Sequence, residues 1–326
     1  MRKILSIFLV TLPLLSVAQF APPAGQEGTT AMHADSSAFV AWATGVVVER
    51  GPMNIANLSL GVANFGPDET VVLGKPGGTM DVVSLGDGGT ATLTFDSPIC
   101  NGKGPDFAVF ENGFANAQTP SLYFLELAFV EVSSDGENFF RFPSFFNAPT
   151  ETQLNGSGCI DPRLIHNFAS KYEAFYGTPF DLDEIPDSDK LDKNRITHVR
   201  LVDVVGNIDP DYATYDSEGH VVNDPWPTPF GSSGFDLDAV GVIHDVAHIG
   251  VDENQSERVA VYPNPTHNTL WVKADNIISV AVFALNGQQL LSSESGCIDV
   301  SMLPDGIYLV RVLTDGNAMV KKFIKN

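Results

Sequence analysis

The stretch FLELAFVEVSSDGENFFRFP, residues 124–143, decides the fold. A tight turn at Asp135 and Gly136 separates two runs of apolar side chains. The apolar positions on the two sides of the turn are Val130, Val132, Phe139, Phe140 and Phe142. Alternating runs joined by a glycine turn are typical of a β-hairpin. We therefore expect antiparallel strands in this part of the chain.

Similar strand-like runs recur on both sides of this hairpin. They include VVVER at 46–50, TATLTF at 90–95, HVRLVDVV at 198–205 and LDAVGVIH at 237–244. The chain also holds 29 Gly and 21 Pro, which favour many short strands over helices. We predict an all-β protein whose main domain is a two-sheet sandwich or jelly roll. The best helix candidate is the segment 161–176.

The composition excludes several classes of protein. Of the 326 residues, 44% are hydrophobic and 18% are charged, so the chain can build a packed core. The formal net charge is -22, whereas a phosphate backbone or an anionic membrane attracts the opposite sign. We therefore expect no nucleic-acid partner, and the charge favours cations or neutral ligands.

The N-terminal sequence MRKILSIFLVTLPLLSVAQ predicts a secretory signal peptide over residues 1–18. Two basic residues precede an apolar run to Leu15 that is too short to span a bilayer. Ser16 to Ala18 then supply a cleavage site of small residues. No later run reaches 18 apolar residues, so we expect no transmembrane segment in the mature chain.

Charge divides the remaining chain into two parts. Residues 19–257 hold 10 basic and 35 acidic side chains, a net of -25, whereas residues 258–326 hold six and five, a net of +1. Such a break in composition predicts a domain boundary. We place an acidic main domain at 19–247, a linker at 248–257 and a C-terminal domain at 258–326.

The C-terminal part reads as a small immunoglobulin-like sandwich with hairpin turns. Its motifs are VYPNPTHNTLWV at 261–272, ALNGQQL at 284–290, LPDGIYLVRV at 303–312 and KKFIK at 321–325. In this order they resemble the type A C-terminal sorting domain of the type IX secretion system of Gram-negative bacteria. The resemblance implies recognition by that secretion machinery, removal by a sortase-like protease, and a secreted or outer-membrane surface location. The alternative is an accessory carbohydrate-binding or immunoglobulin-like domain.

The main domain resembles a group of uncharacterised bacterial cell-surface proteins that often end in sorting tails. The motifs that carry the resemblance include SLGDGGTATLTFDSPI at 84–99, GPDFAVFENGF at 104–114 and DPWPTPFGSSGFDLDAVGVI at 224–243. The strand-SDG-aromatic hairpin is also similar to that of galactose-binding-like β-sandwiches. These resemblances imply an architecture and a location, and no reaction.

Carboxylates inside apolar strands predict a metal site. Asp236 and Asp238 enter an otherwise apolar strand, and Asp106, Glu111 and Asn112 surround another. A buried carboxylate needs a partner, which here is either a basic residue such as Arg200 or a cation. We expect the five residues to hold Ca²⁺, whose ligands are oxygens. The other acidic clusters, at 181–192 and 209–224, suit either calcium or a solvated surface.

Three aromatic residues are candidates for ligand contact. Trp226 and Phe230 lie in a proline-stiffened loop, and Tyr215 precedes it. Exposed aromatic rings stack on sugars and other flat ligands, whereas the Phe run between 107 and 146 has the spacing of a core. Of the cysteines, Cys100 and Cys159 are the candidate disulfide.

We assign no catalytic residue, because short catalytic motifs such as GxSxG or HExxH are absent. The leading hypothesis is a calcium-stabilised, surface-displayed or shed module that binds a glycan or a scarce nutrient. One alternative is a secreted polysaccharide hydrolase that uses two carboxylates, since such pairs have no short signature. The other is a structural or adhesive surface protein.

Overall fold

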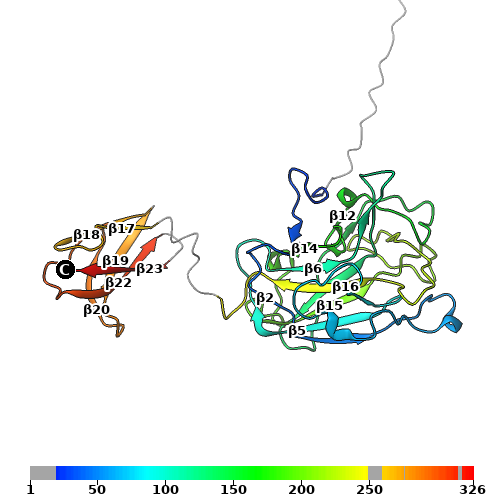
Figure 1. The fold of residues 1–326 in the computed structure, drawn as a ribbon, viewed down its shortest axis with the longest axis horizontal. Helices are drawn as coiled ribbons and strands as arrows, with labels where there is room; N and C mark the ends of the chain where they lie inside the picture. The colour runs from blue at the N-terminus through cyan, green and yellow to red at the C-terminus, as the bar shows by residue number, and fades with distance from the viewer. Residues whose placement is uncertain (1–19, 249–258, 275, 315–317) are drawn as a thin grey trace, which may run out of the picture. The chain divides into compact units, whose positions relative to one another are not determined.

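The computed structural model describes residues 20–248, 259–274, 276–314 and 318–326. The chain divides into two compact units, Met1–His248 (unit 1) and Ile249–Asn326 (unit 2), which are described separately (Figure 1). The expected signal peptide and residues 249–257 of the expected linker lie outside the described residues. In the described part of the chain, no helix is long and apolar enough to cross a membrane.

Unit 1 is built on two antiparallel sheets. The first sheet has the order β1 (Met32–His33), β14 (Tyr176–Phe180), β6 (Phe107–Glu111), β16 (Asp236–Val242) and β2 (Ala41–Trp42), and β4 (Val83–Ser84) also pairs with β16. The second has the order β10 (Phe140–Arg141), β9 (Ala128–Ser133), β15 (Ile196–Asp203), β5 (Thr90–Ile99) and β3 (Gly45–Glu49), and β13 (Phe168–Ala169) also pairs with β9. The all-β prediction is confirmed.

Short elements complete the connections of unit 1. Two-stranded pairings join β7 (Phe114–Ala115) to β8 (Tyr123–Phe124) and β11 (Phe145–Phe146) to β12 (Ile165–His166). Single 3₁₀ turns are η1 (Leu58–Leu60), η2 (Glu69–Val72), η3 (Pro162–Leu164) and η4 (Leu182–Glu184).

The predicted hairpin is present. Strand β9 pairs with β10, with Val132 opposite Phe140. The Asp135 carboxylate closes the turn by accepting hydrogen bonds from the backbone amides of Glu137 and Asn138, and Gly136 adopts a positive φ of 79°. This turn therefore sets the register between the two strands.

The expected helix over 161–176 is wrong. The segment begins with the turn η3 and continues into strands β12 and β13. Asn167, Ser170 and Phe175 have positive φ values, which a right-handed helix cannot contain. Pairing of Phe168 and Ala169 with β9 takes the backbone hydrogen bonds that a helix would have used.

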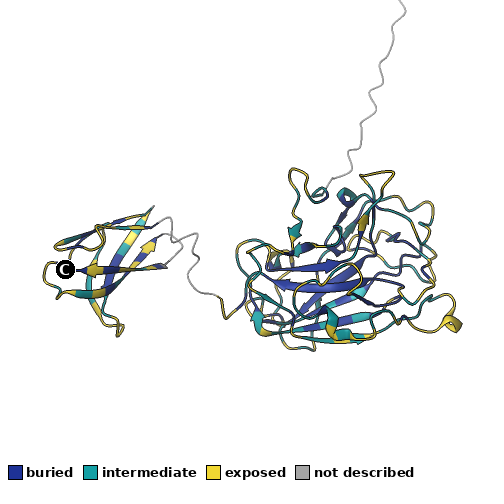
Figure 2. Ribbon diagram, in the orientation of Figure 1, coloured by how far each residue is buried: buried dark blue, intermediate teal, exposed yellow. Residues whose placement is uncertain are grey.

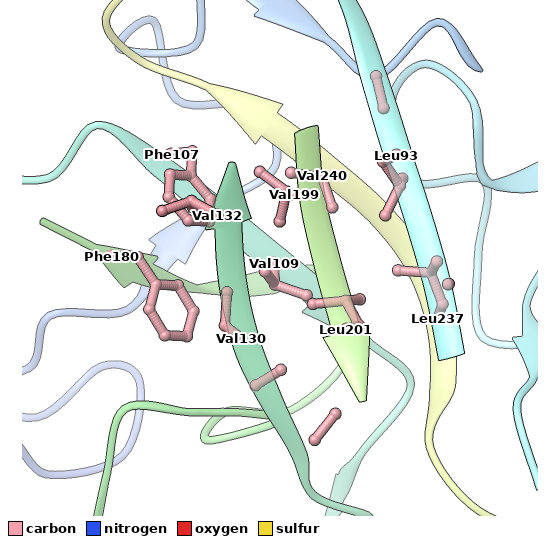
Figure 3. Close-up of a cluster of buried hydrophobic side chains, with 14 of the residues drawn as sticks. Leu93, Phe107, Val109, Val130, Val132, Phe180, Val199, Leu201, Leu237 and Val240 are labelled. Atoms are coloured by element: carbon pink, nitrogen blue, oxygen red, sulfur yellow. The ribbon is translucent and has the colours of Figure 1, made fainter. Parts of the chain in front are cut away.

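The two sheets of unit 1 share one hydrophobic core. Leu93, Val130, Val132, Val199 and Leu201 come from the second sheet, and Phe107, Val109, Phe180, Leu237 and Val240 come from the first (Figure 3). Strands β6 and β16 are buried along their length, as Figure 2 shows. Each such side chain stabilises the fold by about 1.5–3 kcal/mol. A second cluster, around Phe129, Phe146 and Phe168, covers the other face of β9.

Unit 2 has its own small core. One sheet contains β17 (Ala260–Tyr262), β18 (Thr269–Lys273) and β21 (Cys297–Asp299), and the other contains β20 (Gln289–Ser293), β19 (Ile277–Phe283), β22 (Gly306–Thr314) and β23 (Ala318–Lys325). Leu270, Val282, Val310 and Phe323 pack between them. The Asn286–Gly287 turn lies between β19 and β20, with Gly287 at a φ of 86°.

Truncation of Leu201 tests the shared core of unit 1. Leu201 is fully buried on β15, so Leu201→Ala leaves a cavity and lowers the free energy of unfolding by about 2–5 kcal/mol. The matched control is Val47→Ala on β3, where the side chain is 65% exposed. Calorimetry of the mature chain, read at the transition of unit 1, measures both. Equal effects of the two substitutions would contradict the assigned core.

Candidate functional site: a pocket beside buried carboxyls

Three strands direct a carboxyl into the same end of the inter-sheet core. Side chains alternate along a strand, so every second residue faces the core. On β6 the inward row Phe107, Val109 continues to Glu111, and on β15 the row Val199, Leu201 continues to Asp203. On β9 the inward row that begins at Ala128 is preceded, two residues earlier, by Glu126.

The antiparallel register brings these carboxyls together with two others. Leu237 pairs with Glu111, which places Asp236 at the same end of the first sheet. Asp203 pairs with Ala128, at the start of β9. Asp224 joins them because its carboxylate accepts a hydrogen bond of 2.6 Å from the Leu127 amide. We call these five residues the acidic end: Glu111, Glu126, Asp203, Asp224 and Asp236.

Neutral donors hold four of the five carboxyls. Glu111 Oε2 accepts from the Gly113 amide at 2.7 Å and from Ser170 Oγ at 2.5 Å. Asp203 accepts from the Gly88 and Phe235 amides at 2.8 and 2.6 Å. Asp236 accepts from Ser84 Oγ and from Asn112 Nδ2. Glu111 Oε1 and Asp224 Oδ1 are buried and have no hydrogen-bond partner among the described residues.

Glu126 differs from the other four. Glu126 is 5% exposed, and its carboxyl accepts no hydrogen bond from any residue that the structure describes. It lines a pocket of about 530 Å³, together with Asp236, a third carboxyl from Glu173, and the rings of Phe114, Phe124 and Phe230. We call this cavity the end pocket. Its lining includes no Lys, Arg or His among the described residues.

Burial controls the protonation of the acidic end. It raises the pKa of Glu111, Glu126, Asp203 and Asp224 well above the ordinary carboxyl range, and neighbouring carboxylates add to the effect. The pKa of Asp236 rises to about 6, again through burial. Within the described ranges, none of the five forms an ion pair with a basic side chain. Without a bound cation, burial therefore favours the protonated form of these carboxyls.

The structure brings together only part of the expected calcium site. Asn112 donates to Asp236 at 3.1 Å, and electrostatic repulsion from Asp236 and Asp238 reaches Glu111. Asp238 accepts a hydrogen bond from the Gly77 amide, and burial raises its pKa to about 7.

Asp106 does not belong with the other four residues. It precedes β6, whereas Glu111 ends that strand, and an extended strand at about 3.3 Å per residue separates the two. Asp106 lies beside His244 instead, whose Nδ1 is 2.8 Å from its carboxylate. Arg200, the alternative partner for Asp236 or Asp238, pairs with Glu131 instead. Among the described residues, no group of three or more His, Cys, Asp or Glu side chains could hold a metal ion. Calcium therefore stays a prediction.

Of the three expected aromatic ligands, only Phe230 lines the end pocket, with an exposed fraction of 63%. Trp226 borders the acidic end, where its indole donates to Asp87 at 3.0 Å. Tyr215 lies in an isolated bridge with Val221 and is not part of the lining. Phe114, assigned to the core from its spacing, is instead 57% exposed and stacks on Phe124 at a centroid distance of 5.0 Å.

In the structure Cys100 and Cys159 are not joined, and all three cysteines are free thiols. Cys100 is buried after β5, where its amide donates to the His244 carbonyl. Cys159 contacts the Asn116 amide in the loop that pairs with Tyr123. The two thiols therefore belong to separate neighbourhoods, which a long spacing in the sequence could not reveal.

Comparison with known proteins identifies unit 2. Residues 260–326 match the family model described as the secretion system C-terminal sorting domain. The tail is a type IX secretion sorting domain. A sorting domain of this kind directs a protein to the cell surface or the extracellular space, and it interacts with the secretion machinery. The location predicted from the sequence is thus confirmed.

The comparisons say less about unit 1. No curated protein matches the chain. One solved structure, the BSP domain of a biofilm-associated protein, aligns at 10% identity with a TM-score of 0.18. The alignment covers 73% of this chain and 48% of that one, so the chain spans about half of its length. A likeness at this TM-score carries no argument about the function of unit 1.

The buried carboxyls predict a fall in stability with rising pH. Their pKa values are higher in the folded state than in the unfolded state, where carboxyls titrate near about 4. Their stabilising contribution is therefore complete below about pH 4 and is lost as the pH rises through the folded values. For Asp236 and Asp238 these values are about 6 and about 7. Burial lowers the pKa of Lys171 to about 7, so this group changes the free energy of unfolding only at higher pH, between its folded and unfolded pKa values.

We expect the thermal midpoint of unit 1 to decrease as the pH rises from 4.5 to 7, and to decrease less steeply in Glu126→Gln. The substitution removes one buried group that must lose its proton in the unfolded state. The control is Glu151→Gln, at an exposed position, which should follow the original chain. Calorimetry across the pH series measures the slopes. Parallel slopes for Glu126→Gln and the original chain would contradict the account.

Proposed function

We propose that unit 1 is an extracellular ligand-binding module and that its ligand occupies the end pocket. Glu126 is the observation that carries this proposal, since it is almost fully buried, has no described hydrogen-bond partner and faces an open cavity. The carboxyl oxygens of Glu126 are not among the fully buried atoms that lack a partner, so a donor in the pocket can reach them. A hydrogen bond to a charged group contributes about 1.5–3 kcal/mol.

The dimensions and lining of the end pocket support this proposal. A volume of about 530 Å³ lies within the usual range for small-molecule sites. Aromatic rings beside a few convergent polar groups are also the usual composition of such sites. A jelly-roll or galactose-binding-like topology for unit 1, and stabilisation by calcium, belong to the same proposal. Glycans and scarce nutrients are both within its scope.

A second candidate is a polysaccharide hydrolase. Glu126 and Asp236 line the same pocket, and burial raises the pKa of both. Glycoside hydrolysis uses a protonated and an ionised carboxyl on opposite sides of the scissile bond. Release of reducing ends from a polysaccharide panel, lost in both Glu126→Gln and Asp236→Asn, would favour this candidate over binding alone.

A thermal-shift screen of the mature chain tests the proposed function. The probes are mono- and oligosaccharides, amino acids, amines and Ca²⁺ after chelation. We expect at least one probe to raise the midpoint of unit 1, and the shift to shrink in Glu126→Gln while remaining in Glu151→Gln. Stabilisation by bound ligand follows from mass action, about 2.7 kcal/mol at a hundredfold excess over Kd. A panel without any Glu126-dependent shift would contradict the proposal and favour a structural or adhesive role.

Processing of the sorting domain is the second part of the proposal. We propose that a sortase-like protease removes the tail, after which unit 1 is anchored to the surface or released. The intact mass of protein shed by the native bacterium should then lack residues 260–326. A shed form that retains them would contradict removal, although it would not affect the export function of the domain.

A further inference from the structure

We infer that the end pocket binds an organic ammonium ion, a cationic amine carried on an apolar body. The inference rests on the proposed function, because it names the ligand class for the same pocket. Three properties of the lining support it: its excess of hydrogen-bond acceptors, its lack of positive charge and its aromatic wall.

The polar part of the lining is rich in acceptors. Glu126, Glu173 and Asp236 contribute three carboxyls, and the hydroxyls of Thr79, Thr228 and Ser232 can either accept or donate. Asn112 directs its amide nitrogen to Asp236 Oδ2 and to the Thr79 carbonyl, both at 3.1 Å, so these donors are already used. The Gly113 amide is likewise used by Glu111. An ammonium group has donors and no acceptor, which complements such a wall.

Charge points to the same ligand class. No basic side chain lines the pocket among the described residues, and the acidic end behind Glu126 adds Glu111, Asp203 and Asp224 without a described ion pair. Asp87 and Asp238 lie close enough to add to the repulsion at Asp203 and Glu111, respectively. A neutral ligand leaves the ionised form of Glu126 disfavoured. A bound cation relieves the repulsion and favours the ionised form of Glu126.

The aromatic wall separates an organic cation from a metal ion. Phe114 and Phe124 stack with an interplanar angle of 16°, and Phe230 is a mostly exposed ring of the same lining. The faces of aromatic rings attract ammonium groups and also pack against apolar carbon. A bare divalent ion instead requires six to eight oxygen ligands, and the described residues offer no matching group. The pocket volume leaves room for an apolar body beside the amine.

Calorimetric titration with benzylammonium chloride tests the inference, with benzyl alcohol as its neutral counterpart. We expect benzylammonium to bind the mature chain at pH 7.5 and benzyl alcohol to bind at least about tenfold more weakly, since a charged donor is lost. Glu126→Gln should weaken the binding of benzylammonium by about tenfold or more, and Phe230→Ala should weaken it by a smaller factor. Glu151→Gln is the matched control and should bind as the original chain does. Higher ionic strength should weaken the binding of the amine more than that of the alcohol.

Each contrary result has a distinct meaning. Equal affinity for benzylammonium and benzyl alcohol, or undiminished amine binding in Glu126→Gln, would overturn the inference. Binding of a neutral saccharide or Ca²⁺ that depends on Glu126, with no binding of the amine, would overturn it and leave the proposed function intact. Failure of every probe in the screen would contradict the proposed function itself. Calorimetric unfolding of Glu126→Gln at pH 7.5 confirms that the variant is folded, and the substitution is expected to raise its midpoint there.

Discussion

Alternation of side chains along the paired strands is the constraint on which unit 1 depends. It directs Val130, Val199, Leu201 and Val109 into one core between the sheets. The same alternation, continued by one step at the end of the core, directs Glu111, Asp203 and Glu126 inward. A strand cannot turn these carboxyls to solvent without turning its whole apolar row outward as well. The stable core therefore gathers the costly carboxyls at one end, where Glu126 lines the pocket.

The electrostatic consequence is concentrated at one end of the unit. Amides and hydroxyls compensate four of the carboxyls in part, but no described basic residue neutralises them. The basic residues nearby serve other groups: Arg200 and Arg141 both pair with Glu131, and Arg50 donates to backbone carbonyls. The large negative charge of residues 19–257 is thus not only a surface property. Part of it lies in the interior beside an open pocket.

Strand alternation and motif order made the all-β class, the hairpin at Asp135 and the sorting domain predictable from sequence. The same rule could have identified Glu126 and Asp203, because each lies two residues beyond an inward apolar position. The register between β6 and β16 could not be predicted, and it is this register that places Asp106 beside His244 and Glu111 beside Leu237. The loops that carry Asp224 and Phe230 to the site follow no periodic pattern, so their contribution needed the structure.

The central claim is that Glu126 is buried beside the pocket without a counter-charge. Its side-chain pKa tests this claim most directly, by a ¹³C NMR titration of the mature chain labelled at glutamate carboxyls. Comparison with Glu126→Gln assigns the resonance. The account predicts that, in the absence of ligand, the pKa lies well above the ordinary value of 4.5. A pKa at or below 4.5 would show that a partner or solvent already stabilises the carboxylate, and it would contradict the account.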